Sequence, residues 1–124
     1  MRLPPVLLLL SVLSACALFG GGRRHVVFFQ ERSAQLDRQA QSVISGAAAR
    51  ANINPASSVK VIGYTDSAGS PAADVALSQQ RAQTVADALV ADGVAANWLV
   101  REGRGQTGEN PGVASRRVEI IIDP

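Results

Sequence analysis

Residues 59–71, VKVIGYTDSAGSP, contain the transition that decides the fold of this 124-residue chain. The apolar, β-branched run Val59–Tyr64 predicts a buried strand. A turn-rich segment, Thr65–Gly69, ends this strand, and Ser70 and Pro71 then supply a helix N-cap and a residue suited to the first helical position. The stretch therefore predicts a strand that leads directly into a helix.

The helix after this turn is expected to end near Asp92, because Gly93 can adopt the left-handed conformation that stops helices. Upstream, the run His25–Phe29 predicts another strand, and Ser33 is the expected cap of a first helix that ends near Asn52–Pro55. Both helices carry apolar residues at steps of three and four, as amphipathic helices do. These residues are Leu36, Ala40, Val43, Ile44 and Ala47 in the first helix and Leu77, Ala82, Val85, Ala86 and Leu89 in the second.

The C-terminal third of the chain predicts two more strands. We expect one around Trp98–Glu102, a Gly-rich loop at Gly103–Ala114, and a final strand at Arg117–Asp123, where apolar and polar residues alternate. The order is then βαβαββ. Because crossover connections between parallel strands are right-handed, we expect an α+β two-layer sandwich with both helices on one face of a small mixed sheet.

The first residues of the chain predict export. Met1–Ala15 combines an early positive charge with a short apolar run and small residues, which is the pattern of a secretory signal peptide. A membrane-spanning helix is the alternative, but it needs about 20 apolar residues in a row, and prolines and serines interrupt this run. We therefore divide the chain into a signal peptide (1–15), a short linker that begins with Cys16 (16–24) and one globular domain (25–124).

The charge balance argues against a nucleic-acid partner. The formal net charge is +2, and loss of Arg2 with the leader would reduce it to +1. The basic residues are scattered apart from two Arg-Arg doublets, and neither doublet forms a stripe that could bind a polyanion. Since Cys16 is the only cysteine, no disulfide can form within the chain.

We find no signal for a cofactor, a metal or an active site. Gly103–Gly108 fits the dinucleotide pattern GxGxxG, but a strand follows it where that motif requires a helix. His25 is the only histidine, so neither a metal site nor a Ser-His or Cys-His pair can be built around it. Trp98 is expected to pack under the third strand rather than to stack on a sugar. The chain is therefore expected not to be an enzyme.

Arg81 is the most unusual residue of the second helix. It lies four residues after Leu77 and four before Val85, which places its guanidinium on or beside the apolar stripe. Three interpretations are open. The side chain can lie along the core edge with its head in water, it can form a structural ion pair with Asp66, or the two residues can flank a cleft that binds a ligand with both an ammonium and a carboxylate.

Three motifs in order resemble the OmpA-like peptidoglycan-binding domain. Val61–Gly69 is similar to the family's V-x-G-x-T-D-x-x-G element, Leu77–Ala82 to its L-S-x-x-R-A element, and Arg116–Ile120 to its closing N-R-R-V-E-I element. Near the N-terminus, Leu13–Cys16 resembles the lipobox of bacterial lipoproteins.

This resemblance implies a function and a set of residues. Asp66 and Arg81 would bind the free zwitterionic end of meso-diaminopimelate in the peptidoglycan stem peptide, with Arg116 as a further ligand-binding residue. The chain would be cleaved on the N-terminal side of Cys16, Cys16 would be lipidated, and Ala17 after it favours sorting to the outer membrane. The expected protein is thus a non-enzymatic tether between the outer membrane and the cell wall.

The sequence departs from the family pattern at several positions. Asp74 replaces the usual Asn and places a second carboxylate near the site, where it could help to hold the ammonium or weaken the grip on the ligand's carboxylate. Ser115 also replaces an Asn, and the loop at Gly103–Ala114 is shorter than usual. These departures support an alternative, a protein interaction module of an envelope or secretion assembly that does not bind peptidoglycan. A peptidoglycan hydrolase is a third and more distant hypothesis.

Overall fold

The computed structural model describes residues 24–54, 58–66, 69–108 and 112–123. The predicted signal peptide and Cys16 lie outside these ranges. The elements follow in the predicted order βαβαββ, with two short 3-10 helices added. Their bounds are β1 (Arg24–Phe28), α2 (Arg38–Ile53), β2 (Ser58–Thr65), α3 (Pro71–Ala91), a 3-10 helix (Ala96–Trp98), β3 (Leu99–Gln106), a second 3-10 helix (Val113–Ser115) and β4 (Arg117–Asp123).

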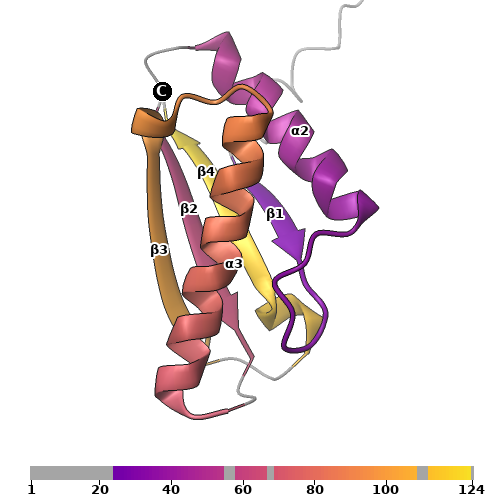
Figure 1. Ribbon diagram of the computed structural model, residues 1–124, viewed down its shortest axis with the longest axis vertical. Coiled ribbons are helices and arrows are strands. Elements are labelled where there is room, and N and C mark those ends of the chain that lie inside the picture. The colour runs from indigo at the N-terminus through magenta and orange to yellow at the C-terminus, as the bar shows by residue number, and fades with distance from the viewer. Residues whose placement is uncertain (1–23, 55–57, 67–68, 109–111, 124) are drawn as a thin grey trace, which may run out of the picture.

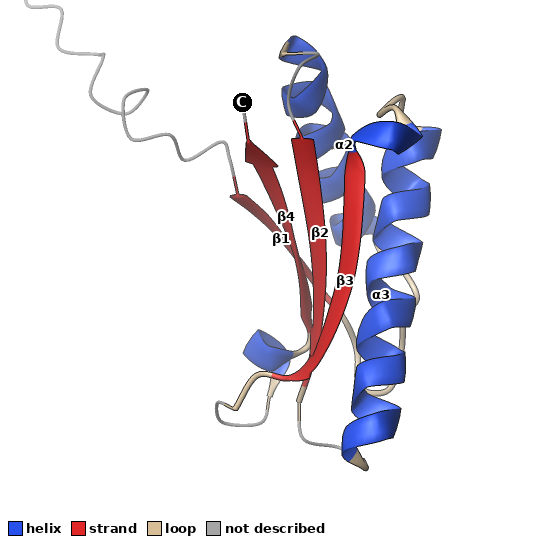
Figure 2. Ribbon diagram, turned by 90° about the vertical axis from the view of Figure 1, so that its left-hand side faces the viewer, coloured by secondary structure: helices blue, strands red, loops and turns tan. Residues whose placement is uncertain are grey.

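The four strands form one mixed sheet in the order β1-β4-β2-β3. β2 and β3 are parallel, whereas β4 runs antiparallel to both of its neighbours, β1 and β2. Figure 1 shows α2 and α3 in front of the sheet, and the side view in Figure 2 shows both helices on the same face. The predicted two-layer α+β sandwich is therefore confirmed. No helix in the described ranges has the length and apolar character needed to cross a membrane.

The core lies between the sheet and the helices. In β4, Val118 and Ile120 are fully buried and Ile122 nearly so, which confirms the alternation predicted for this strand. They pack with Ile44 of α2 and Leu89 of α3.

Two glycines bring α3 unusually close to the sheet. Gly63 of β2 and Gly103 of β3 are register partners. A Cβ at Gly63 would lie 2.0 Å from the carbonyl oxygen of Ser78, and one at Gly103 would lie 2.5 Å from the backbone nitrogen of Gln79. The Ser78 hydroxyl accepts a hydrogen bond from the backbone N–H of Gly105 at 2.9 Å. Gly103 and Gly105 of the G-x-G-x-x-G stretch thus allow close packing of α3 on β3.

The start of the first helix was predicted wrongly. Asp37, not Ser33, is the N-cap of α2, and its Oδ1 accepts from the backbone N–H of Ala40 at 2.7 Å. The Ser33 hydroxyl accepts from the backbone N–H of Gln35, which forms a local turn before the helix. Leu36 therefore precedes the helix, although it still packs against the core. The predicted helix ends, near Asn52–Pro55 and near Asp92, are confirmed, because the C-caps of α2 and α3 are Asn54 and Asp92.

The predicted bounds of the third strand, Trp98–Glu102, began too early and ended too early. β3 begins at Leu99 and continues to Gln106, so the first part of the predicted Gly-rich loop is strand. It remains a strand because α3 packs on its glycines, which a sequence pattern does not reveal. Trp98 lies in a 3-10 helix and is partly buried against the core, in agreement with the packing role expected for it.

Candidate binding site at the end of the sheet

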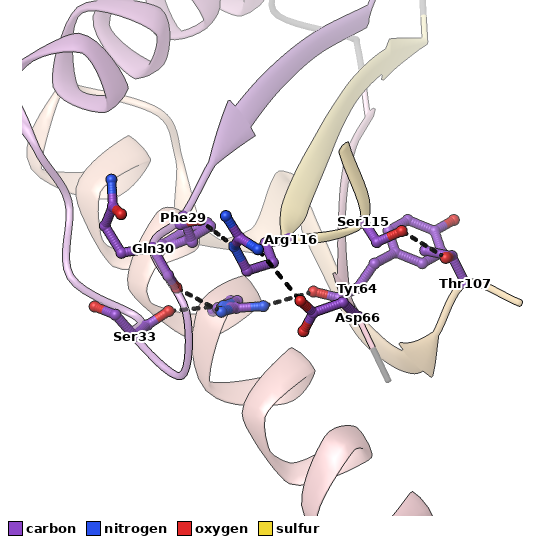
Figure 3. Close-up of polar contacts among 9 residues, drawn as sticks. Phe29, Gln30, Ser33, Tyr64, Asp66, Thr107, Ser115 and Arg116 are labelled. Atoms are coloured by element: carbon purple, nitrogen blue, oxygen red, sulfur yellow. Dashed lines mark hydrogen bonds and ion pairs between the residues drawn. The ribbon is translucent and has the colours of Figure 1, made fainter. Parts of the chain in front are cut away.

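The motif residues meet at one end of the sheet. β1 and β2 end here and β4 begins here, because both run antiparallel to β4. Phe28 pairs with Arg117, so Phe29 lies opposite Arg116, and the N–H of Phe29 donates to the carbonyl of Arg116 at 2.9 Å. Asp66 follows the last residue of β2. Figure 3 shows Asp66 and Arg116 facing each other across this end.

Arg81 reaches this end of the sheet from α3 and is completely buried, with 0% of its surface exposed. Its Nε donates to the carbonyl of Ser33 at 2.7 Å, Nη1 to that of Tyr64 at 3.1 Å and Nη2 to that of Gln30 at 3.0 Å. Its guanidinium carbon lies 5.2 Å from the centre of the Phe29 ring, within cation–π range. One side chain therefore holds the loop after β1 against the end of β2.

Two of the interpretations of Arg81 can now be judged. The guanidinium does not reach water, so the interpretation in which the stem lies along the core edge and the head is solvated is wrong. A structural ion pair between Asp66 and Arg81 is also wrong, because the ion pair of Asp66 is formed with Arg116, at 3.3 Å between Oδ2 and Nη1. The sequence could not show which of the two arginines pairs with Asp66, because Arg116 lies 50 residues away from Asp66 in the chain.

Arg116 is held more loosely than Arg81. Its Nε donates to the carbonyl of Phe29 at 3.0 Å, and its Nη1 donates to Asp66. The Arg116 side chain is 13% exposed and that of Asp66 is 10% exposed. The pair therefore lies at the boundary between the protein interior and solvent.

The cluster of Asp66, Arg81 and Arg116 carries two positive charges and one negative charge. Burial lowers the pKa of Arg81, the negative charge of Asp66 opposes this shift, and the positive charge of Arg116 adds to it. Arginine stays protonated despite such shifts. The cluster thus has one excess positive charge in a poorly solvated place, which favours an additional anionic group.

Asp74 lies in the first turn of α3 and is also buried, with 3% of its surface exposed. Its Oδ2 accepts a hydrogen bond from the side-chain amide of Gln106, at the end of β3, at 2.5 Å. Sequence analysis missed Gln106, because nothing in the Gly-rich stretch indicated that it faces α3.

Two hydroxyl residues line the same end of the sheet. The hydroxyls of Thr107 and Ser115 lie 2.9 Å apart, and Ser115 is fully buried. A dashed line joins the two hydroxyls in Figure 3. The Ser that replaces the family's Asn is therefore a structural link between the end of β3 and the start of β4. The hydroxyl of Thr65 is fully buried and has no hydrogen-bond partner in the described part of the chain.

The acceptors around Arg81 could not be found from the sequence. The guanidinium contacts the backbone of Gln30, Ser33 and Tyr64, and a backbone carbonyl is present at every residue. Only the buried position of Arg81 on the helix stripe indicated that such partners had to exist. Within the described ranges, no group of three or more His, Cys, Asp or Glu side chains could hold a metal ion.

The fold and the charged cluster define a two-layer α+β domain with a polar site at the ends of its central strands. The model of the OmpA family matches residues 28–118, and the chain belongs to this family. The match includes all four candidate residues of the site, Asp66, Asp74, Arg81 and Arg116.

Individual relatives agree with this assignment. The chain is 39% identical over 108 residues to "Probable lipoprotein YiaD" of Escherichia coli (strain K12), which covers 79% of this chain and 48% of that protein. It is 42% identical over 79 residues to "Peptidoglycan-binding protein ArfA" of Mycobacterium tuberculosis (strain ATCC 25618 / H37Rv), which covers 56% of this chain and 23% of ArfA. The chain thus spans about half of YiaD and less of ArfA.

The fold is similar to that of a solved structure, the peptidoglycan-associated lipoprotein from Burkholderia pseudomallei. The TM-score is 0.73, with 24% identity over 80% of this chain and 90% of that chain. None of these names denotes an enzyme, in agreement with the non-enzymatic domain expected from the sequence.

Proposed function

We propose that this domain binds peptidoglycan without catalysis, by holding the free end of meso-diaminopimelate in the stem peptide. The observation that carries the proposal is the cluster in which the Asp66 carboxylate lies beside two guanidiniums, those of Arg81 and Arg116. Peptidoglycan-binding and peptidoglycan-associated proteins among the relatives support it.

The chemistry of the ligand fits the charges of the site. The side chain of diaminopimelate ends in an ammonium and a carboxylate on one carbon. Asp66 accepts hydrogen bonds from the ammonium, and the guanidiniums donate to the carboxylate in charge-assisted hydrogen bonds. Arg81 is already fixed by three carbonyls and is fully buried, so it supplies a fixed positive charge for the carboxylate without further loss of side-chain freedom.

Asp74 is a proposed second carboxylate for the ammonium. Its Oδ2 accepts from Gln106, and we assign the ammonium to its other oxygen, Oδ1. Asp74→Asn therefore separates the two roles that the sequence left open. Weaker binding of a diaminopimelate peptide by this variant would indicate a contact with the ammonium, and tighter binding would indicate that Asp74 repels the ligand's carboxylate.

The anchor completes the proposal. After removal of residues 1–15, a lipidated Cys16 would hold the protein in the outer membrane with its domain in the periplasm, so that many weak contacts tie membrane and wall together. Cys16→Ser is expected to abolish palmitate labelling and to release the protein from the membrane fraction. Membrane retention and labelling of the Cys16→Ser protein would contradict the anchor.

Co-sedimentation with purified sacculi tests the binding function. The soluble protein, residues 16–124 with Cys16→Ser, is expected to sediment with sacculi, and Asp66→Ala or Arg81→Ala to reduce the bound fraction strongly. Arg104→Ala is the matched control, because this exposed arginine pairs with Glu102 on the other face of the sheet. Binding that survives both cluster substitutions would reject the proposed site.

A protein interaction module without peptidoglycan binding is the second candidate. It is favoured by one observation: Asp66, Asp74 and Arg116 each already have a polar partner within the protein. If the folded wild-type protein stays in the supernatant, this function replaces the first. The same samples test for hydrolysis, since a hydrolase would release soluble muropeptides, and we expect none.

A further inference from the structure

The ion pair between Asp66 and Arg116 occupies Oδ2 of the carboxylate that the proposed function assigns to the ligand's ammonium. An ammonium that binds at this oxygen takes the place of a guanidinium that is already there, at 3.3 Å from Oδ2. The free energy of binding then depends on which group pairs with the displaced guanidinium. The ion pair can therefore discriminate between ligands.

Arg116 is the arginine that can move. Among the described residues, its guanidinium has one backbone acceptor, the carbonyl of Phe29, and its side chain is partly exposed. Arg81 donates to three carbonyls and is fully buried, so its displacement would break three hydrogen bonds at once. Exchange at Asp66 thus involves Arg116 and leaves Arg81 in place.

We infer that Arg116 determines ligand specificity by competing for Asp66, so that the site selects stem peptides ending in a zwitterion over those ending in a plain amine. The inference rests on the proposed function and deepens it. A ligand with both charges breaks one ion pair and forms two, because its carboxylate receives the released guanidinium. A plain amine forms one ion pair and leaves Arg116 unpaired at a poorly solvated position, which is costly.

The ligands that differ in this way are two kinds of stem peptide. Meso-diaminopimelate and lysine share an ammonium at the end of an aliphatic side chain, but only diaminopimelate adds a carboxylate on the same carbon. An interaction that only attracts ammonium, such as a free Asp66, would bind both. Competition from Arg116 makes the second carboxylate necessary.

The test compares two synthetic tetrapeptides that differ only in the third residue, which is meso-diaminopimelate or lysine. Isothermal titration calorimetry measures the affinity of each peptide for the soluble protein, residues 16–124 with Cys16→Ser. The wild type is expected to prefer the diaminopimelate peptide by about tenfold or more. In Arg116→Gln, the ratio of the affinities for the two peptides is expected to fall towards one. The lysine peptide gains affinity because no cation competes, and the diaminopimelate peptide loses affinity because no guanidinium receives its carboxylate.

Two controls separate charge from fold. Arg116→Lys keeps a competing cation and is expected to keep the preference, whereas Arg104→Gln, on the open face of the sheet, is expected to leave both affinities unchanged. Thermal unfolding of each variant shows whether it is folded under the conditions of the titration.

A third peptide, in which the side-chain carboxylate of diaminopimelate is amidated, needs only the wild type and is expected to bind as weakly as the lysine peptide. Equal binding of the amidated and free peptides would overturn the inference. Equal weakening of both original peptides by Arg116→Gln would also overturn it, while the proposed function would stand. If the wild type binds none of the peptides, the proposed function itself fails.

Discussion

Two ion pairs of this domain differ in burial rather than in distance. On the open face of the sheet, Glu102 and Arg104 form an ion pair at 3.0 Å, with about half of each side chain exposed. At the end of the sheet, Asp66 and Arg116 lie 3.3 Å apart with 10% and 13% exposed, and Arg81 is fully buried. The shorter pair is therefore the one in water.

This difference indicates what each region does. An exposed ion pair contributes little, because water solvates both charges when the pair is broken. A buried charge without partners is costly, so the buried cluster must be satisfied by the fold or by a ligand. The exposed pair is thus nearly independent of the fold, whereas the buried cluster can couple binding to structure. The predictions below test this contrast.

The largest effect is expected for Arg81→Met. The substitution keeps the bulk but leaves the carbonyls of Gln30, Ser33 and Tyr64 without their donor, and we expect a loss of about 3–5 kcal/mol in the free energy of unfolding. Urea denaturation measures it. Arg104→Met is the matched control and should unfold like the wild type. Similar midpoints for the two variants would remove the contrast between the regions.

Asp66→Asn is expected to have the next largest effect. It leaves two guanidiniums together with no negative charge between them, and we expect a loss of about 1–3 kcal/mol, the range for hydrogen bonds to charged groups. Thermal unfolding is the measurement. Asp87→Asn, which alters an exposed carboxylate on α3 that accepts from Gln83, is the control. A more stable Asp66→Asn protein would mean that the unliganded site is held under strain for binding.

The effect of salt on stability should also differ between the two regions. At about 1 M salt the screening length is about 3 Å, so exposed charges interact weakly while buried ones are little affected. The stability difference between wild type and Asp66→Asn is expected to persist between low and high salt. The smaller difference between wild type and Glu102→Gln should disappear. Loss of both differences would show that water reaches the cluster.

The smallest effect concerns pH. A hydrogen bond from Arg104 lowers the pKa of Glu102 below its ordinary value of 4.5. Because the folded-state pKa is the lower one, this bond stabilises the fold above pH 4.5 and the stabilisation is lost as the pH falls through the folded-state pKa. Wild type and Glu102→Gln should therefore converge in stability in acid. A difference that grows on acidification would contradict the assignment.

The sequence predicted the architecture better than the details of the site. Strand and helix order followed from the periodicity of apolar residues, and Ser70, Asp92 and Gly93 were placed correctly because caps and stops are local chemistry. Ser33 was misassigned because several polar residues precede α2 and any of them could cap it. Arg81 also holds the backbone of Gln30 and Ser33 in the loop before α2, a tertiary contact that the sequence does not show.

By itself, the sequence determined the fold class, the family and the presence of a charge that had to be satisfied within the core, since these depend on periodicity, motif order and the position of Arg81 on a helix stripe. Only the tertiary structure decided the partners. Arg81 donates to backbone carbonyls, and Asp66 pairs with Arg116 across 50 residues of sequence. The reason is physical: backbone acceptors have no sequence signature, and an ion pair between distant residues exists only once the sheet aligns the strand ends that carry them.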